Sequence, residues 1–313
     1  MIVTGFVLGI DGGGSKTVAL LADTAGQVLG RGSAGPSNQQ VVGFEHACAT
    51  IESAVAAAFA HAQREPQPVA AIGLGLAGVD RPEDHERFQA WANGCWPHAK
   101  LSIANDATLV LAAGTPDGWG LALVGGTGSI AYGRDSHGRH ARAGGWGYLL
   151  GDEGSSYAIG LAALQAVTRA ADGHAAPTML TDVILGHWSL PTPQALIGHV
   201  YGGQLAPVMI AGLALLVEET ATAGDAVAQA IVAEACHELA LALHAVARRL
   251  ELPAPTPCAL AGGLLLNRPR VAQGMLQAAR ELDLALDPVT LVAEPALGAV
   301  RIAARLCETA GQR

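Results

Sequence analysis

The segment FVLGIDGGGSKTVALLA, residues 6–22, decides the fold class because it places a glycine turn between two strands. Residues 6–10 are an apolar run of strand length, and residues 17–22 are another. A P-loop and a dinucleotide-binding turn both open a helix, whereas this turn joins strand to strand. Consecutive glycines in such a hairpin let backbone N–H groups approach an anion closely. The segment is therefore a phosphate-binding hairpin or an ordinary glycine-rich turn.

The same pattern returns later in the chain. Residues 120–124 read as a strand, GGTGS at 125–129 as a glycine turn, and 130–132 as the next strand. In both places a reverse turn, a third strand and helices follow. This duplicated plan predicts two similar α/β lobes. We expect a cleft between the lobes, because small ligands usually bind in clefts between domains.

Periodicity and turn residues predict the other elements. Helices are expected at 44–62, 82–94, 106–113, 153–171, 206–221, 225–250, 268–282 and 296–308, and further strands at 27–32, 69–76, 101–104, 258–261 and 289–293. We expect the first lobe to span residues 1–117, with the terminal helix 296–313 completing it. The second lobe, with helical insertions, is then expected to span residues 118–295.

Composition limits the classes of function. The 313-residue chain is 50% apolar and has a net charge of -9, so it lacks the basic surface that nonspecific nucleic-acid binding needs. Its five cysteines are odd in number and contain no C-x-x-C pair, which favours a reducing compartment. The first residues lack a basic leader, and no apolar run approaches the ~20 residues that span a bilayer. These features predict a soluble cytoplasmic protein with no nucleic-acid or membrane partner.

Two carboxylates stand out as chemical candidates. Asp106 follows the predicted strand 101–104 and starts a helix, which places it at the edge where open α/β sheets bind ligands. Phosphoryl transfer needs one carboxylate to orient the attacking hydroxyl, although Asp is also a favoured helix N-cap. Asp11 could hold a hydrated Mg²⁺ through oxygen. Lys16 either projects from the edge of the hairpin or contacts a phosphate.

The longest informative motif is GGWGYLLGDEGSSY, residues 144–157. With the two hairpins and the late AGG at 261–263, the chain resembles the actin/hexokinase/Hsp70 superfamily. The motif itself resembles the N-acetylglucosamine kinases of the BadF/BadG/BcrA/BcrD group, and the resemblance covers essentially the whole chain. It implies two ribonuclease-H-like (actin-like ATPase) lobes with an interlobe cleft. It also implies the use of ATP and Mg²⁺, an amino-sugar substrate and a homodimer.

The resemblance also implies roles for particular residues. ATP contacts are expected from Gly12, Gly13, Gly14, Ser15, Lys16, Thr17, Gly126, Thr127, Gly128, Ser129, Ala261, Gly262 and Gly263, with Asp11 positioning Mg²⁺. Asp106 matches the base that accepts the proton of the sugar 6-hydroxyl. Sugar contacts are expected from Asn38, Asp106, Gly145, Trp146 and Asp152. The bland alternative is a buried Trp and an Asp that caps helix 153–171. Animal members have a polar residue after G-T-G-S, whereas this chain has Ile130, which removes a possible hydrogen bond.

The expected reaction is therefore ATP-dependent phosphorylation of N-acetylglucosamine at its 6-hydroxyl. Glucosamine and N-acetylmuramic acid are the alternative substrates. An ATPase that activates a dehydratase or reductase would need cysteines to hold an Fe–S cluster between subunits, and the cysteines here are scattered. A sugar sensor without catalysis would be expected to lack the base, but Asp106 is present.

Overall fold

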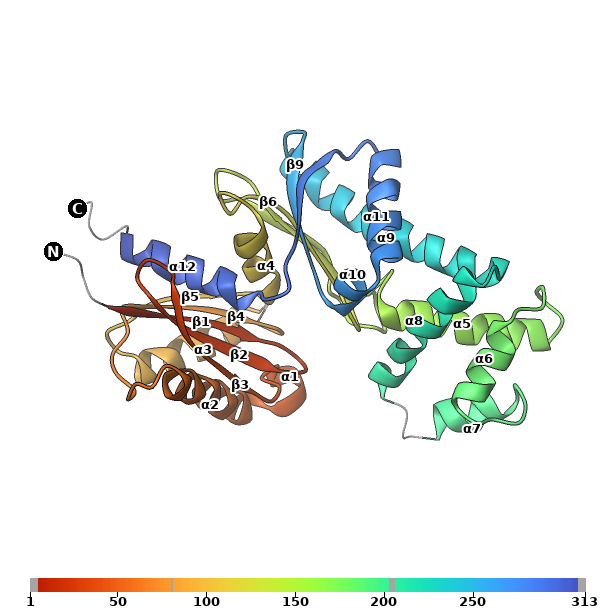
Figure 1. The fold of residues 1–313 in the computed structure, drawn as a ribbon, viewed down its shortest axis with the longest axis horizontal. Helices are drawn as coiled ribbons and strands as arrows, with labels where there is room; N and C mark the ends of the chain where they lie inside the picture. The colour runs from red at the N-terminus through yellow and green to blue at the C-terminus, as the bar shows by residue number, and fades with distance from the viewer. Residues whose placement is uncertain (1–4, 80, 203–205, 309–313) are drawn as a thin grey trace. The chain divides into compact units, whose positions relative to one another are not determined.

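The computed structural model describes residues 5–79, 81–202 and 206–308 (Figure 1). The chain divides into two compact units. The first consists of Met1–Trp119 with Val292–Arg313, and the second of Gly120–Leu291. Each unit is built around a five-stranded sheet.

The first unit has the sheet order β3-β2-β1-β4-β5. Its strands are β1 (Phe6–Gly12), β2 (Thr17–Asp23), β3 (Val28–Ala34), β4 (Ala71–Leu76) and β5 (Lys100–Ala104). Its helices are α1 (Gln39–Val42), α2 (Phe44–His61), α3 (Pro82–Cys95), α4 (Asp106–Gly114) and α12 (Ala296–Glu308). The first three strands pair antiparallel, whereas β4 is parallel to β1 and β5 is parallel to β4.

Both faces of the strands β1, β2 and β4 are buried, which explains why these strands read as apolar runs. Successive side chains of a strand point to opposite faces. Leu8 and Ile10 therefore join the core beneath α2, whereas Val7 joins a smaller core with Val300 of α12. Figure 1 shows α2 and α12 on opposite sides of the sheet. Helix α12 comes from the far end of the sequence, so this core joins the first and last segments of the chain.

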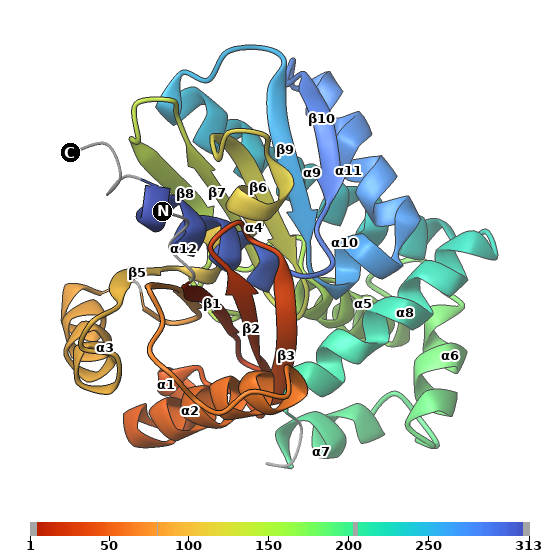
Figure 2. The same ribbon diagram turned by 60° about the vertical axis from the view of Figure 1, so that its left-hand side comes forward.

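The second unit repeats this topology. Its strands are β6 (Gly120–Gly125), β7 (Ser129–Arg134), β8 (His140–Gly144), β9 (Thr256–Ala261) and β10 (Leu286–Leu291), and they lie in the order β10-β9-β6-β7-β8 (Figure 2). Three antiparallel strands again stand beside two parallel ones. Read from the other edge, the order is that of the first sheet. The predicted duplication and the predicted two-lobed α/β class are both confirmed.

Helices make up most of the rest of the second unit: α5 (Ser156–Ala171), α6 (Leu180–His187), α7 (Ala195–Tyr201), α8 (Pro207–Thr222), α9 (Ala226–Leu250), α10 (Gly263–Asn267) and α11 (Pro269–Glu281). Among the described residues, α9 is the one helix long and apolar enough to cross a membrane by length and composition alone. Its buried Leu239, Leu243 and Val246 belong to the core of the unit. Such burial is typical of a core helix.

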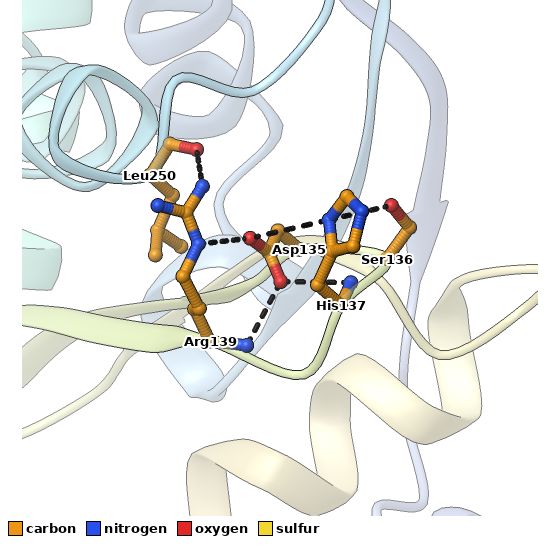
Figure 3. A network of polar contacts seen from close by, with 5 residues as sticks. All are labelled: Asp135, Ser136, His137, Arg139 and Leu250. Atoms are coloured by element: carbon orange, nitrogen blue, oxygen red, sulfur yellow. Dashed lines mark hydrogen bonds and ion pairs between the residues drawn. The ribbon is translucent and has the colours of Figure 1, made fainter.

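A buried carboxylate closes the turn between β7 and β8, where the sequence predicts a reverse turn (Figure 3). Asp135 Oδ1 accepts hydrogen bonds from the backbone amides of His137 (2.9 Å) and Arg139 (2.8 Å). Arg139 Nε donates to Asp135 Oδ2 at 2.6 Å, and a second guanidinium nitrogen donates to Leu250 O at 3.4 Å. The hydrogen bond from Arg139 lowers the pKa of Asp135. The turn is thereby attached to the end of α9.

The positions of two predicted elements need correction. The predicted strand 289–293 is observed at Leu286–Leu291, and it includes Pro288. Strand β10 is an edge strand with a register shift between Leu286 and Val289, and proline is tolerated in such places. The predicted helix 153–171 begins at Ser156, because Ser155 is its N-cap and accepts from the amide of Ala158 at 3.2 Å. Sequence analysis did not predict the short helices α1, α6, α7 and α10.

Gly73 on β4 gives a direct test of the packing beneath α12. An added Cβ would lie 2.4 Å from the backbone oxygen of Ala299, which cannot move without shifting the helix. We expect Gly73→Ala to lower the free energy of unfolding by about 1–3 kcal/mol through overpacking. Urea denaturation measures this change.

Gly94 on α3 is the matched control, because no atom lies within 4 Å of its added Cβ. Gly94→Ala should leave the free energy of unfolding unchanged or raise it by up to about 1 kcal/mol, since alanine favours helix. Equal destabilisation by the two variants would contradict the proposed contact.

Candidate functional site

The first glycine turn is a β-hairpin, as the sequence predicts. Gly12 pairs with Thr17, and the Gly13 amide donates to Lys16 O at 3.0 Å. The side chains of Ser15 and Lys16 are exposed at the tip. An added Cβ on Gly12 would lie 2.6 Å from both Leu76 Cδ2 and Ser37 Oγ, so the base of the turn has no room for a side chain. The tip therefore offers a ligand backbone amides and the ammonium group of Lys16.

The buried base of this hairpin also holds the segment before α1. Thr17 Oγ1 lies 2.8 Å from both Gly35 O and Ser37 Oγ, and the Ser37 amide donates to Gly13 O at 3.1 Å. Asn38 then caps α1, with Oδ1 accepting from the Gln40 amide at 3.0 Å. Thr17 therefore supports the turn through its side chain, and the side-chain oxygen Oδ1 of Asn38 caps α1.

Asp11 and Asp106 lie at the carboxyl ends of β1 and of the parallel strand β5 and interact electrostatically. The pKa of Asp11 is raised to about 7, mainly by burial and also by the negative charge of Asp106, while Lys16 opposes the shift. Asp106 is the first residue of α4, and Asn105 is its N-cap. Asp106 Oδ1 also accepts from the Ala107 amide at 2.9 Å. The structure thus assigns the cap to Asn105 and brings two distant acids together.

Glu294, just before α12, is an acid that sequence analysis missed. Its charge also raises the pKa of Asp11. One of its oxygens pairs with Arg31, whereas Oε1 is buried and has no hydrogen-bond partner among the residues described. No local pattern marks this residue, because its position depends on α12 returning to the first sheet.

These acids fit a hydrated divalent cation better than a directly caged one. A cation would offset the repulsion that raises the pKa of Asp11. Within residues 5–79, 81–202 and 206–308, no three His, Cys, Asp or Glu side chains converge as metal ligands. Mg²⁺ commonly keeps several waters and uses one or two carboxylates together with substrate phosphates. Asp11 therefore suits contact through water.

The second glycine turn is a hairpin bound to α5. Gly125 pairs with Ser129 across β6 and β7, and the Gly126 amide donates to Gly128 O at 2.9 Å. The amides of Ser156 and Tyr157, in the first turn of α5, donate to Gly126 O (2.9 Å) and Thr127 O (3.2 Å). These bonds fix the carbonyl groups of the turn.

The loop Gly144–Asp152, which we call the signature loop, follows β8. Gly144, Gly145 and Gly147 have positive φ angles of 77°, 70° and 83°, which favour glycine. Trp146 is 63% exposed, so the alternative of a buried Trp is wrong. One face of its ring lies beneath the guanidinium of Arg142, at 4.9 Å. The aromatic side chain is accessible to a ligand.

Asp152 ends this loop, buried and with a positive φ of 61°. Burial raises its pKa, while hydrogen bonds from the backbone amides of Ser129 and Gly147 act in the opposite direction. Ser155, and not Asp152, caps α5. The carboxylate therefore contacts both the second hairpin and its own loop.

The AGG segment lies against the base of the second hairpin. Gly262 has a φ of +90°, and an added Cβ would lie 2.2 Å from Gly125 O. Gly263 then begins α10. The second unit therefore brings together the hairpin Gly126–Ser129, the signature loop and Ala261–Gly263, while the first unit brings together the hairpin 11–17 and Asp106.

Comparison with known proteins agrees with this arrangement. The BadF/BadG/BcrA/BcrD ATPase family matches residues 8–303. The chain belongs to this family. It is 34% identical to an N-acetylmuramic acid/N-acetylglucosamine kinase of Clostridium acetobutylicum, covering 84% of this chain and 86% of the relative. It is 33% identical to an N-acetyl-D-glucosamine kinase of Dictyostelium discoideum, covering 78% and 80%.

A solved structure from Chromobacterium violaceum, provisionally named an N-acetylglucosamine kinase, has the same fold. Its TM-score is 0.76 at 29% identity, and the match covers 95% of this chain and 98% of that one. The two-lobed actin-like ATPase class predicted from the sequence is thus confirmed.

The raised pKa of Asp11 predicts a pH-dependent stability. The folded state retains the Asp11 proton up to about pH 7, whereas a free Asp loses it near 3.8. The stabilising contribution of neutral Asp11 is therefore complete below pH 3.8 and is lost as pH rises through about 7. Relative to wild type, Asp11→Asn should gain up to about 4 kcal/mol of unfolding free energy between pH 4 and pH 8 without Mg²⁺.

Urea denaturation at the two pH values measures this gain. The exposed Asp172, changed to Asn, is the control. A constant difference between Asp11→Asn and wild type across this range would contradict the burial of the Asp11 charge.

Proposed function

We propose that this protein is an ATP-dependent amino-sugar kinase that phosphorylates the 6-hydroxyl of N-acetylglucosamine. The observation that carries the proposal is the pair of glycine hairpins at equivalent positions of two duplicated sheets, with Asp106 at the carboxyl edge of the first. Kinases of amino sugars among the relatives support the same substrate class. The proposed product is N-acetylglucosamine 6-phosphate.

In this proposal, the hairpins hold the phosphates of ATP through backbone amides. At Gly14 and Gly126 an added Cβ would meet no atom within 4 Å, so the backbone of the hairpins Gly12–Thr17 and Gly126–Ser129 is open there. Ala261–Gly263 is the segment that we assign to the adenosine. The exposed Lys16 adds a positive charge at the first tip. Asp11 would hold Mg²⁺ through water, and the bound ion would neutralise charge on the phosphates.

Asp106 is the proposed catalytic base. Its carboxylate accepts the proton of the sugar 6-hydroxyl as that oxygen bonds to the γ-phosphorus and the bond to the ADP oxygen breaks. Asn38, Gly145, Trp146 and Asp152 are the proposed sugar contacts. Trp146 offers an exposed ring for stacking, and Asp152 offers a carboxylate to hydroxyl groups.

One relative is named for both N-acetylmuramic acid and N-acetylglucosamine. N-acetylmuramic acid is therefore the second candidate substrate, and glucosamine the third. The apolar Ile130 lies against Gly145, whose added Cβ would be 2.8 Å from Ile130 Cδ1. This contact gives the signature loop an apolar neighbour in place of a polar one.

An activator ATPase that uses an Fe–S cluster receives no support from the cysteines. Cys48, Cys236 and Cys258 are buried, whereas a cluster held between subunits needs cysteines at the surface. All five cysteines are free thiols, which fits the proposed cytoplasmic location. A homodimer is proposed from the family resemblance.

The direct test is release of ADP from ATP and Mg²⁺ in a coupled assay, with each candidate sugar in turn. We expect the highest kcat/KM with N-acetylglucosamine, compared with N-acetylmuramic acid, glucosamine, N-acetylmannosamine and glucose. Highest activity on N-acetylmuramic acid or glucosamine would replace the proposed substrate. Absence of sugar-dependent ADP release with all five would reject the kinase proposal.

Asp106→Asn tests the catalytic base. This variant keeps the side-chain volume and the cap by Asn105, so the fold and ATP affinity should be retained. Loss of the proton acceptor should lower kcat by roughly 10²–10⁴. Near-normal kcat would remove Asp106 from the mechanism, whereas Asp172→Asn should behave like wild type.

A further inference from the structure

The carboxylate of Asp152 lies where the second hairpin meets the signature loop. Without its own side chain, Gly128 leaves room for this carboxylate: an added Cβ would lie 2.5 Å from Asp152 Oδ2 and 3.0 Å from its Cγ. The backbone N–H groups of Ser129 in the hairpin and of Gly147 in the signature loop both act to lower the pKa of this carboxyl group, so it faces both segments. One side chain therefore joins two segments that bind different ligands in the proposed reaction.

Neighbouring bonds reinforce this junction. Ser129 Oγ donates to Glu153 O at 2.7 Å, and the Gly145 amide donates to Ser129 O at 2.9 Å. The amides of α5 bind the hairpin carbonyls, so the hairpin cannot shift freely without disturbing the loop. Asp152 is also held at a positive φ that non-glycine residues seldom adopt, which the surrounding bonds must maintain.

We propose that Asp152 is a positioning residue that couples the nucleotide hairpin to the sugar loop, in addition to contacting the sugar. This inference rests on the proposed kinase function. An ionised carboxylate offers about four acceptor positions, so amides from two segments leave places for sugar hydroxyls. A sugar that binds these two oxygens therefore engages the same Asp152 carboxylate that faces the Ser129 amide. Sugar and nucleotide should then change each other's affinity by the same factor.

The test compares the affinity for AMPPNP–Mg²⁺ with and without saturating N-acetylglucosamine, by calorimetry. In wild type we expect the sugar to change nucleotide affinity by a factor within the usual range of about 5- to 150-fold. Asp152→Asn keeps the shape but replaces one acceptor oxygen with a donor that faces the same backbone amides. It should weaken nucleotide binding even without sugar and bring the coupling factor close to 1.

Gly128→Ala disturbs the same contact from the hairpin side. The three atoms nearest to its added Cβ all belong to the Asp152 carboxyl group, so the clash is with that group. We expect Gly128→Ala to weaken sugar binding as well as nucleotide binding. Asp152→Ala removes the clashing atoms. Adding Gly128→Ala to that variant should therefore reduce nucleotide and sugar affinity less than Gly128→Ala does in wild type.

Asp172→Asn, at the opposite end of α5, is the control and should retain the wild-type coupling factor. Circular dichroism checks that each variant is folded. Loss of sugar affinity alone in Asp152→Asn, with nucleotide affinity and the coupling factor unchanged, would overturn the inference and leave the kinase proposal intact. Failure of the kinase proposal is recognised separately, as wild-type protein that releases no ADP with any of the sugars.

Discussion

At Gly9 and Gly73, the backbone of α12 occupies the space that a Cβ would need, 2.4 Å from Val300 N and Ala299 O. An added Cβ on Gly298 of the same helix would lie 2.0 Å from Leu109 O of α4. Helix α12 can therefore lie directly on β1 and β4, which bury their apolar side chains on both faces. The position of the first hairpin depends on this contact, because β1 carries Asp11 and the glycine turn at its end.

Glycines at close contacts also determine the packing of the second unit. Gly262 lies against Gly125 O, and Gly128 lies against the carboxylate of Asp152. Three loops thus meet with little space between them. A ligand that displaces one of these loops must act on the others, because close-packed interiors transmit strain. Binding energy from a sugar can then affect the segment proposed to hold phosphate.

Buried acids give the first unit its electrostatic character. Asp11 is poised near neutral pH because burial and Asp106 both disfavour its charged form. Glu294 adds to this effect although it comes from the other end of the sequence. In contrast, the charge of Asp135 is stabilised by Arg139 in a turn. An aspartate thus has a raised pKa at the candidate site and a lowered pKa in the turn.

Local sequence patterns were enough to predict most strands, the two hairpins and the long helices, because apolar periodicity and turn residues act locally. Helix 296–308 was predicted to the residue. These patterns missed α6 and α7, since short helices flanked by prolines depend on burial of residues such as Leu180 and Leu196 for stability. The effect of Glu294 on Asp11 and the contact of Asp152 with Gly128 follow from the tertiary fold. Both interactions join segments that are separate in the sequence, and the second depends on the space that Gly128 leaves.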